Sequence, residues 1–406
     1  MRGSLGLSAY RTLSGRRAPS DFAPAHDRPP GELVWIHAAE QGNNRAVNDL
    51  AHRLAGSRHG CHVLLTTDHD SFGGRGAPAV LVDAMPPDHP VTAQAFAAHW
   101  APDVVVWAWG GLRPNLVLAT AESGAHMMLV DAARDGFDGR RDRWLPEVPK
   151  RLLEQFHHVS ARDRNAHLRL AQLGRPLDTI ALSAPLHPFG RMLPAADSDI
   201  ADVSQALGGR PVWLAASVAS DEIDAVLRAH KSSLKASHRL LLILVTADSK
   251  DADACTECAH REGLRTVFWG DGEMPDDNCQ VLLVDTDDDL GLWLRIAPVT
   301  FLGGSLHAGH QVCDPYSAAA HGTAIIYGPH VGVQADAFTR LMNAGAARIV
   351  NSSDTLGRSV GQMIAPDHAA QMAMAGWDVV TQGADSLDRI IDHIETHLDT
   401  RPQGAL

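Results

Sequence analysis

The part of the sequence richest in potential chemistry is residues 301–330, FLGGSLHAGHQVCDPYSAAAHGTAIIYGPH. The glycines of this stretch can bring bare backbone against a ligand, because glycine has no Cβ. A helix that begins near Asp314 or Pro315 would point the positive end of its dipole at the same place, which suits a phosphate. Asp314 could also accept both hydroxyls of a ribose. The stretch therefore predicts a nucleotide site.

A purely structural interpretation of the same residues stays open. The glycines would then form ordinary turns, and Asp314 would only cap the helix by accepting backbone N–H groups. Other signals are weaker. Cys255 and Cys258 form a CxxC, but no second pair has the spacing of a zinc site, so we expect no metal.

Short apolar strands alternate with amphipathic helices along the chain. One such helix covers residues 43–56, with Val47, Leu50, Ala51 and Leu54 on one face. Continuous apolar strands separated by helices predict parallel sheets, whose ligands bind at the carboxyl ends of the strands. The predicted strands are 33–37, 62–67, 104–109, 127–132, 158–161 and 179–182, then 212–217, 241–246, 281–285, 299–304, 324–328 and 347–350.

A chain of 406 residues suits two domains. The passage 186–211, rich in Pro, Gly and Asp, separates the two series of strands. The predicted division is a basic segment 1–30, a Rossmann-like domain 31–190, a linker 191–210, a second Rossmann-like domain 211–375, and a C-terminal segment 376–406. A helix over 386–398 carries Leu387, Ile390, Ile391 and Ile394 on one face and is expected to pack back on the first domain.

Charge and cysteine content limit the classes of partner. The net charge of −13 argues against a general nucleic-acid binder, which needs a basic face. Five cysteines without a secretory signal favour reduced cytosolic thiols. Residues 1–17 are basic and amphipathic but have no apolar run of about 20 residues, so this segment is expected either to lie on a membrane surface or to be an ordinary surface helix.

Five motifs, in order along the chain, resemble the 3-deoxy-D-manno-octulosonic acid (Kdo) transferases: WIHAAEQG, RPNL, RPVWLAAS, DLGL and the stretch 301–330. The resemblance implies an α/β fold of the GT-B type, with two facing Rossmann-like domains, an N-terminal half that binds the acceptor and a C-terminal half that binds CMP-Kdo. It implies no cofactor. The donor-nucleotide residues that it implies are Ser217, Asp289, Gly304, Ser305, His310, Gln311 and Asp314.

The expected catalytic chemistry falls in the loop after the first strand. Transfer with inversion needs a base that deprotonates the acceptor hydroxyl. In the family that base is a glutamate directly after the loop glycine, where this chain has Asn43, an amide that cannot take a proton at neutral pH. Glu40 is the nearby carboxylate that could substitute, unless it only favours the start of a helix. His37, at the end of the strand, is expected to be structural.

Further departures concern the acceptor and the donor phosphate. Trp109, Gly111 and Arg113 replace family residues in WGGLRPN, and Ala247 and Asp248 stand at an Arg-His pair. Arg113, Arg140 and Arg141 are the expected acceptor contacts, although the loop that holds Arg140 and Arg141 could simply be solvated. Asp287 and Asp288 would repel a phosphate unless they turn to solvent or share a cation. Glu222 matches a family glutamate, with helix capping as its default role.

The resemblance leads to one principal hypothesis and two alternatives. The principal hypothesis is a Kdo transferase of lipopolysaccharide biosynthesis, cytoplasmic and peripheral on the inner membrane, with CMP-Kdo as donor and a lipid A precursor as acceptor. One alternative is a catalytically degenerate paralogue that binds a nucleotide or lipid A precursor without transfer. The other is a GT-B enzyme that uses a different sugar nucleotide.

Overall fold

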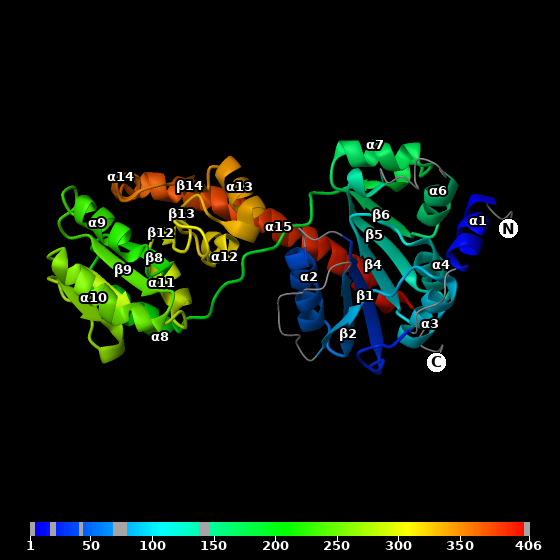
Figure 1. Cartoon of the computed structure of the whole chain (residues 1–406), viewed down its shortest axis with the longest axis horizontal. Helices are drawn as coiled ribbons and strands as arrows, with labels where there is room; N and C mark the ends of the chain where they lie inside the picture. Colours follow the sequence, from blue (N-terminus) through cyan, green and yellow to red (C-terminus); the bar gives the residue numbers. More distant parts are fainter. Residues whose placement is uncertain (1–4, 17–21, 40–43, 68–78, 138–146, 402–406) are drawn as a thin grey trace. The chain divides into compact units, whose positions relative to one another are not determined.

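The computed structural model describes residues 5–16, 22–39, 44–67, 79–137 and 147–401 (Figure 1). The chain divides into two compact units. The first contains residues 1–188 and 382–406, and the second contains residues 189–381. The second unit is therefore inserted, in sequence, between two parts of the first.

The first unit is built on a parallel sheet of seven strands in the order β3-β2-β1-β4-β5-β6-β7. Three tryptophans, Trp35, Trp100 and Trp107, are fully buried in its core. The strands are β1 Glu32–Ala38, β2 Cys61–Thr67, β3 Val80–Ala84, β4 Val104–Ala108, β5 His126–Ala132, β6 His158–Ala161 and β7 Ala181–Leu182. The helices are α1 Leu5–Ser14, α2 Asn44–Ser57, α3 Pro90–Trp100, α4 Pro114–Glu122, α6 Glu147–Leu153 and α7 Arg164–Gln172.

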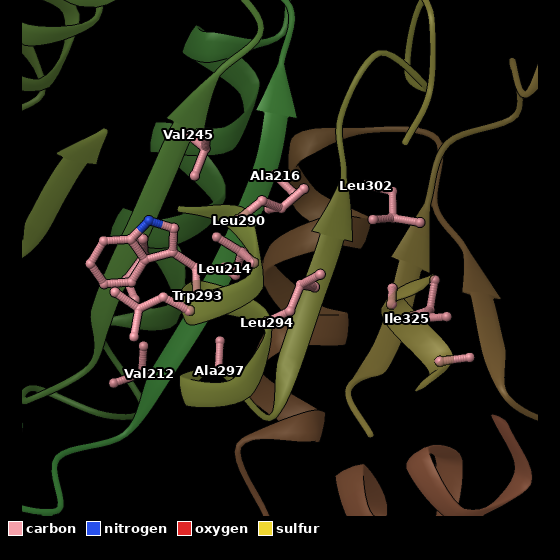
Figure 2. Packing of buried hydrophobic residues seen from close by; sticks show 14 of the residues in the cluster. Val212, Leu214, Ala216, Val245, Leu290, Trp293, Leu294, Ala297, Leu302 and Ile325 are labelled. Atoms are coloured by element: carbon pink, nitrogen blue, oxygen red, sulfur yellow. The ribbon is translucent and has the colours of Figure 1, made fainter. Parts of the chain in front are cut away.

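The second unit repeats this plan with the order β10-β11-β9-β8-β12-β13-β14. Its strands are β8 Val212–Val218, β9 Leu241–Thr246, β10 Thr266–Phe268, β11 Val281–Val284, β12 Val299–Leu302, β13 Ala324–Tyr327 and β14 Ala347–Ile349. Its helices are α8 Asp197–Leu207, α9 Ile223–Ser233, α10 Ala252–Arg261, α11 Leu290–Ile296, α12 Pro315–Ala320, α13 Ala335–Asn343 and α14 Ser353–Met363, together with the first part of α15 Pro366–Thr400. Figure 2 shows Leu290, Trp293 and Leu294 of α11 packed beside β8 and β12.

The predicted α/β class with two doubly wound parallel sheets is confirmed. Two strands, β3 and β10, were missed. Both lie at a sheet edge. β3 includes Asp83, and β10 has only three residues, all of intermediate burial. Neither therefore has the long, continuous apolar run that is typical of a central strand. The predicted face of α2 is confirmed, since Val47, Leu50, Ala51 and Leu54 are all fully buried. Residues 191–210, expected as a linker, include α8.

The last helix belongs to both units. α15 is a single helix of 35 residues, and its residues from Gln382 onward cluster with the first unit. There Leu387 and Ile394 are fully buried. Ion pairs join Arg53 to Asp388 at 2.6 Å and Arg58 to Asp399 at 2.8 Å.

The N-terminal helix α1 packs on the first unit. The Tyr10 hydroxyl donates to Asp88 Oδ2 at 2.8 Å, and the Asn115 side-chain amide donates to Ser14 Oγ at 3.1 Å. Leu7 packs against the apolar core. The described residues of this segment are intermediate or exposed, and Leu13 is 61% exposed. Among the described residues, no helix is long and apolar enough to span a membrane.

Candidate functional site

The loop that follows β12 begins with a close backbone approach. Gly304 has φ of +72°, and a Cβ at this position would lie 2.5 Å from the carbonyl oxygen of Gln311. Gly328, after β13, approaches the same loop, since a Cβ there would lie 2.2 Å from the carbonyl oxygen of Ser305. Both contacts are too short for any side chain, so these two positions require glycine.

Glu222 holds this loop from beneath. Glu222 is fully buried, and its carboxylate accepts the backbone N–H groups of Gly304 and Leu306, each at 2.6 Å. A third N–H, that of Ala219, reaches it at 3.3 Å. Hydrogen bonds from N–H groups offset the cost of burying a carboxylate. The expected capping role is wrong, because the Glu222 side chain makes no cap hydrogen bond to α9.

Ser305 ties the same loop to the neighbouring strand. It is fully buried, and its hydroxyl donates to the Leu302 carbonyl at 2.5 Å and accepts from the Gly328 N–H at 2.7 Å. The backbone carbonyl of Ser305 accepts from His330 N–H at 2.9 Å. The polar groups described here for Gly304 and Ser305 are thus used inside the protein. The exposed part of the loop is residues 307–311.

Asp314 has the capping geometry of the structural interpretation. Its carboxylate accepts the N–H groups of Tyr316 and Ser317, each at 3.1 Å, and the Ser317 hydroxyl at 2.6 Å. α12 therefore begins at Pro315, as expected. Within the exposed part of the loop, His310 Nε2 lies 3.0 Å from Asp221, while Gln311 is exposed.

Ser217 stands at the end of β8, in a strained backbone conformation. Its φ is +48°, and the pairing of β8 with β9 changes register between Ala215 and Val218. The Ser217 hydroxyl donates to Asp287 Oδ1 at 2.9 Å and accepts from the Cys313 thiol at 2.9 Å. Burial raises the pKa of the Asp287 carboxyl, and the neighbouring charge of Asp288 raises it further. The pKa of the Cys313 thiol rises to about 11, chiefly through burial.

Two further acidic residues of the second unit, one an expected nucleotide contact and one a departure, also have defined positions. Asp289, expected to contact the nucleotide, accepts the indole N–H of Trp269 at 3.1 Å. Asp248, at the position of the expected cation, caps a short 3₁₀ helix by accepting Lys250 N–H at 3.0 Å. The side chain of Lys250 also pairs with Asp248, with Nζ 3.4 Å from the carboxylate. At the position where the resemblance implies a cation, the chain has a carboxylate whose described contacts are local.

The first unit contains a polar cluster that sequence reasoning missed. Asp131, at the end of β5, has φ of +51° and is 2% exposed. It accepts the Trp109 indole N–H at 2.6 Å and two N–H groups of Arg162 at 3.1 and 3.2 Å. Burial raises the pKa of the Asp131 carboxyl, and the Arg162 guanidinium opposes part of that rise. An acidic residue inside the apolar run 127–132 was the available signal.

The remaining expected residues of the first unit fall in two groups. His37 is fully buried, with Nδ1 3.0 Å from Thr66 Oγ1, and burial, followed by Arg113, lowers its pKa to about 3, which fits the expected structural role. Arg113 donates to the Pro86 carbonyl at 2.8 Å. Glu40, Asn43, Arg140 and Arg141 lie outside the described residues.

The described residues include no group of three or more His, Cys, Asp or Glu side chains arranged to hold a metal ion. What the described residues offer chemically is a shaped loop over β12 and β13 in the second unit, supported by a buried carboxylate. Beside it lies a serine that is hydrogen-bonded to an acid and a thiol.

Comparison with protein families gives a match over residues 15–186 to the model described as 3-deoxy-D-manno-octulosonic-acid transferase (kdotransferase). A 3-deoxy-D-manno-octulosonic acid transferase of Bordetella pertussis is 29% identical over 405 residues, 94% of this chain and 92% of the relative. That of Haemophilus influenzae is 24% identical over 384 residues, 91% of this chain and 88% of the relative.

Two solved structures are also similar. The C-terminal CMP-Kdo binding domain of WaaA from Acinetobacter baumannii has a TM-score of 0.42 and 22% identity, covering 48% of this chain and 100% of that domain. A putative UDP-N-acetylglucosamine 2-epimerase of Listeria monocytogenes has a TM-score of 0.46 and 13% identity, covering 92% of this chain and 98% of the epimerase chain. The fold assignment rests on the two sheets described above.

Proposed function

We propose that the chain is a member of the 3-deoxy-D-manno-octulosonic acid transferase family and that it moves Kdo from CMP-Kdo to a lipid A precursor in lipopolysaccharide biosynthesis. The observation that carries the proposal is similarity along both units, since the Bordetella relative aligns with 94% of this chain. In this proposal the second unit binds the donor and the first unit binds the acceptor.

The donor site that we propose has a supporting layer and a contact layer. Gly304 and Ser305 shape the loop, because their described polar groups are used by Glu222, Leu302 and Gly328. His310 and Gln311 lie on the exposed part of the loop, and we assign them contacts with the nucleotide. We also assign nucleotide contacts to Ser217, Asp289 and Asp314, each of which would have to share or exchange a present hydrogen bond.

The reaction that we propose is a displacement at the anomeric carbon of Kdo. The Glu40 carboxylate takes the proton of the acceptor hydroxyl, and the oxygen of that hydroxyl attacks the anomeric carbon. The bond from that carbon to the phosphate oxygen breaks, and CMP leaves with the electron pair. Asn43 lies three residues from Glu40 and can orient the acceptor but cannot take its proton.

The acceptor side of the proposal uses guanidinium groups. Arg113, Arg140 and Arg141 would bind phosphates of a lipid A precursor, since guanidinium groups pair with phosphate in two parallel hydrogen bonds. Such an acceptor is presented at a membrane surface. We therefore also propose that the protein acts peripherally at the cytoplasmic face of the inner membrane.

One observation favours a second candidate, a paralogue that binds without transfer. The Asp287 carboxylate lies 2.9 Å from the hydroxyl of Ser217, inside the proposed donor site. An anion at this position opposes binding of a phosphate, and Asn43 replaces the family base. Binding without turnover would follow if Glu40 does not act as the base.

The deciding experiment incubates the full chain with CMP-Kdo and a lipid A precursor and measures the Kdo-containing product by mass spectrometry. We expect transfer in the wild type and a loss of about 10²-fold or more in Glu40→Gln, since loss of a general base typically costs that much. Glu122→Gln is the matched control, because this exposed carboxylate pairs only loosely with Arg11, at 3.9 Å.

Calorimetry with CMP separates the remaining outcomes. Binding of CMP without transfer by the wild type would favour the second candidate. Absence of both CMP binding and transfer would refute both. Equal activity of Glu40→Gln and the wild type would leave the family function but remove Glu40 as the base.

A further inference from the structure

Five histidines gather where the last part of α15 meets the sheet of the first unit. His126 begins β5, His157 and His158 lie at the start of β6, and His393 and His397 lie one turn apart on α15. These five residues are named the histidine cluster. The first unit alone supplies all of them.

The rings of the histidine cluster contact one another directly. His126 stacks on His397, with 3.8 Å between ring centroids and 19° between planes, and on His157 at 4.5 Å. His158 and His393 lie 4.3 Å apart. Two strands are thereby joined to the helix through pairs of imidazoles.

These contacts suit neutral rings and oppose charged ones. Stacked neutral imidazoles attract, whereas two imidazoliums at about 4 Å repel. His157 Nδ1 also accepts the Met127 backbone N–H at 3.1 Å, and a proton on that nitrogen would remove the acceptor. Burial, followed by the neighbouring histidines, lowers the pKa of His126 to about 4, and burial with His393 and Arg175 does the same for His158.

Charged groups of both signs lie around the cluster. The cavity that His158 and His393 line also holds Asp131, Asp392 and Arg389, and Asp131 is already paired with Arg162 at 3.1 Å. Burial and Arg401 lower the pKa of His397, and Asp103, which Arg401 already contacts, partly opposes them. Arg175, near His158, adds positive charge. Two further carboxylates of α15 are already paired, Asp388 with Arg53 of α2 and Asp399 with Arg58, which follows that helix.

We propose that the histidine cluster is an acid-sensitive latch, which holds residues 382–400 of α15 on the first unit at neutral pH and releases them as the pH falls toward 5. The helix gives way rather than the strands, because β5 and β6 are held by ladder hydrogen bonds to each other and to β4 and β7, whereas α15 is held by side chains. The described residues contain no group of three or more His, Cys, Asp or Glu side chains that could hold a metal ion, so a metal is not part of the proposal.

The sign of the effect follows from proton binding. Once the helix is released, the exposed ring of His126 has a pKa near 6.5 and is protonated below it, whereas in the docked state the same ring resists protonation down to about 4. Docking is therefore unaffected above pH 6.5 and weakens between pH 6.5 and 4. One such group favours release by about 30-fold at pH 5, and solvent at these partly exposed rings reduces this to roughly tenfold.

The test is hydrogen–deuterium exchange of the full chain at pH 7.5 and 5.0, corrected for the intrinsic pH dependence of amide exchange. We expect exchange of residues 382–400 to rise roughly tenfold at pH 5.0, while peptides of β8 and β9 in the second unit do not change. His126→Phe keeps an aromatic ring that cannot be protonated, and a double variant, His393→Gln with His397→Gln, removes both imidazoles of the cluster from α15.

Both sets of variants are expected to reduce the pH response to less than about threefold. His368→Gln is the control, since His368 is exposed, lies on the same helix and belongs to the second unit. The inference is overturned if residues 382–400 are equally protected at both pH values in the wild type. It is also overturned if His126→Phe and the double variant both keep the full response.

Discussion

Replacing Glu222 by glutamine changes one atom of the donor loop's support. The carboxylate accepts N–H groups on both oxygens, since Gly304 N–H reaches Oε2 and Leu306 N–H reaches Oε1, each at 2.6 Å. A glutamine has one oxygen and one NH2 group. Whichever way the amide turns, one of these two N–H groups faces another donor.

The magnitude can be estimated from those hydrogen bonds. A buried N–H without an acceptor costs about 1–3 kcal/mol, and the surviving bonds weaken by roughly 1 kcal/mol because their acceptor is no longer charged. The variant no longer buries a charge, which offsets part of this cost. We therefore expect Glu222→Gln to lower the free energy of unfolding of the second unit by about 2–4 kcal/mol. In a unit of this size that lowers Tm by about 4–16 °C.

Two measurements on the same protein distinguish a role in the loop from general destabilisation. Calorimetry at 15 °C, where the variant is still folded, should show CMP binding weakened at least tenfold, and kinetics should show a higher KM for CMP-Kdo with an unchanged KM for the acceptor. Asp224→Asn is the control, since this half-exposed acid lies on α9 and pairs with Arg228 of the same helix at 3.1 Å. A variant with the wild-type Tm and CMP affinity would refute the reasoning.

Two further predictions concern the same unit. Gly328→Ala should destabilise the protein by about 2 kcal/mol or more and weaken CMP binding, because its Cβ would lie 2.2 Å from the Ser305 carbonyl; thermal unfolding and calorimetry check it, with Gly361→Ala, whose Cβ has no neighbour within 4 Å, as the control. Asp287→Asn should strengthen CMP binding, and the gain should grow as the pH rises through the raised pKa of Asp287, since only the ionised carboxylate repels the phosphate. A titration of CMP affinity from pH 4 to 8 that runs parallel in the two proteins would contradict this prediction.

The sheets could be predicted from sequence because their central strands are continuous apolar runs. β9, LLILVT, is fully buried, and a short run of apolar residues of this kind is typical of a central strand in a parallel sheet. β10 was not predicted, because TVF is short and only half buried at a sheet edge. Local patterns thus suffice wherever burial on both faces dictates the residue types.

The site was less predictable, because its contacts join residues far apart in the chain. Nothing near Glu222 indicates that its partners are Gly304 and Leu306, 82 and 84 residues away. The positive φ of Ser217 and Asp131 likewise depends on a change of strand register, which no local pattern specifies. The glycines and the helix start at Pro315 were predictable, since both follow local rules.

The shared helix α15 also sets the order in which the two units can mature during synthesis. The second unit has all of its residues once the ribosome has passed Thr381, but the first unit, although begun earlier, lacks the stretch that carries Leu387 and Ile394. Until those last residues emerge, the apolar surface that they cover stays open to solvent. The half made first is therefore the half completed last, and nascent chains of this protein carry an unfinished domain for most of their translation.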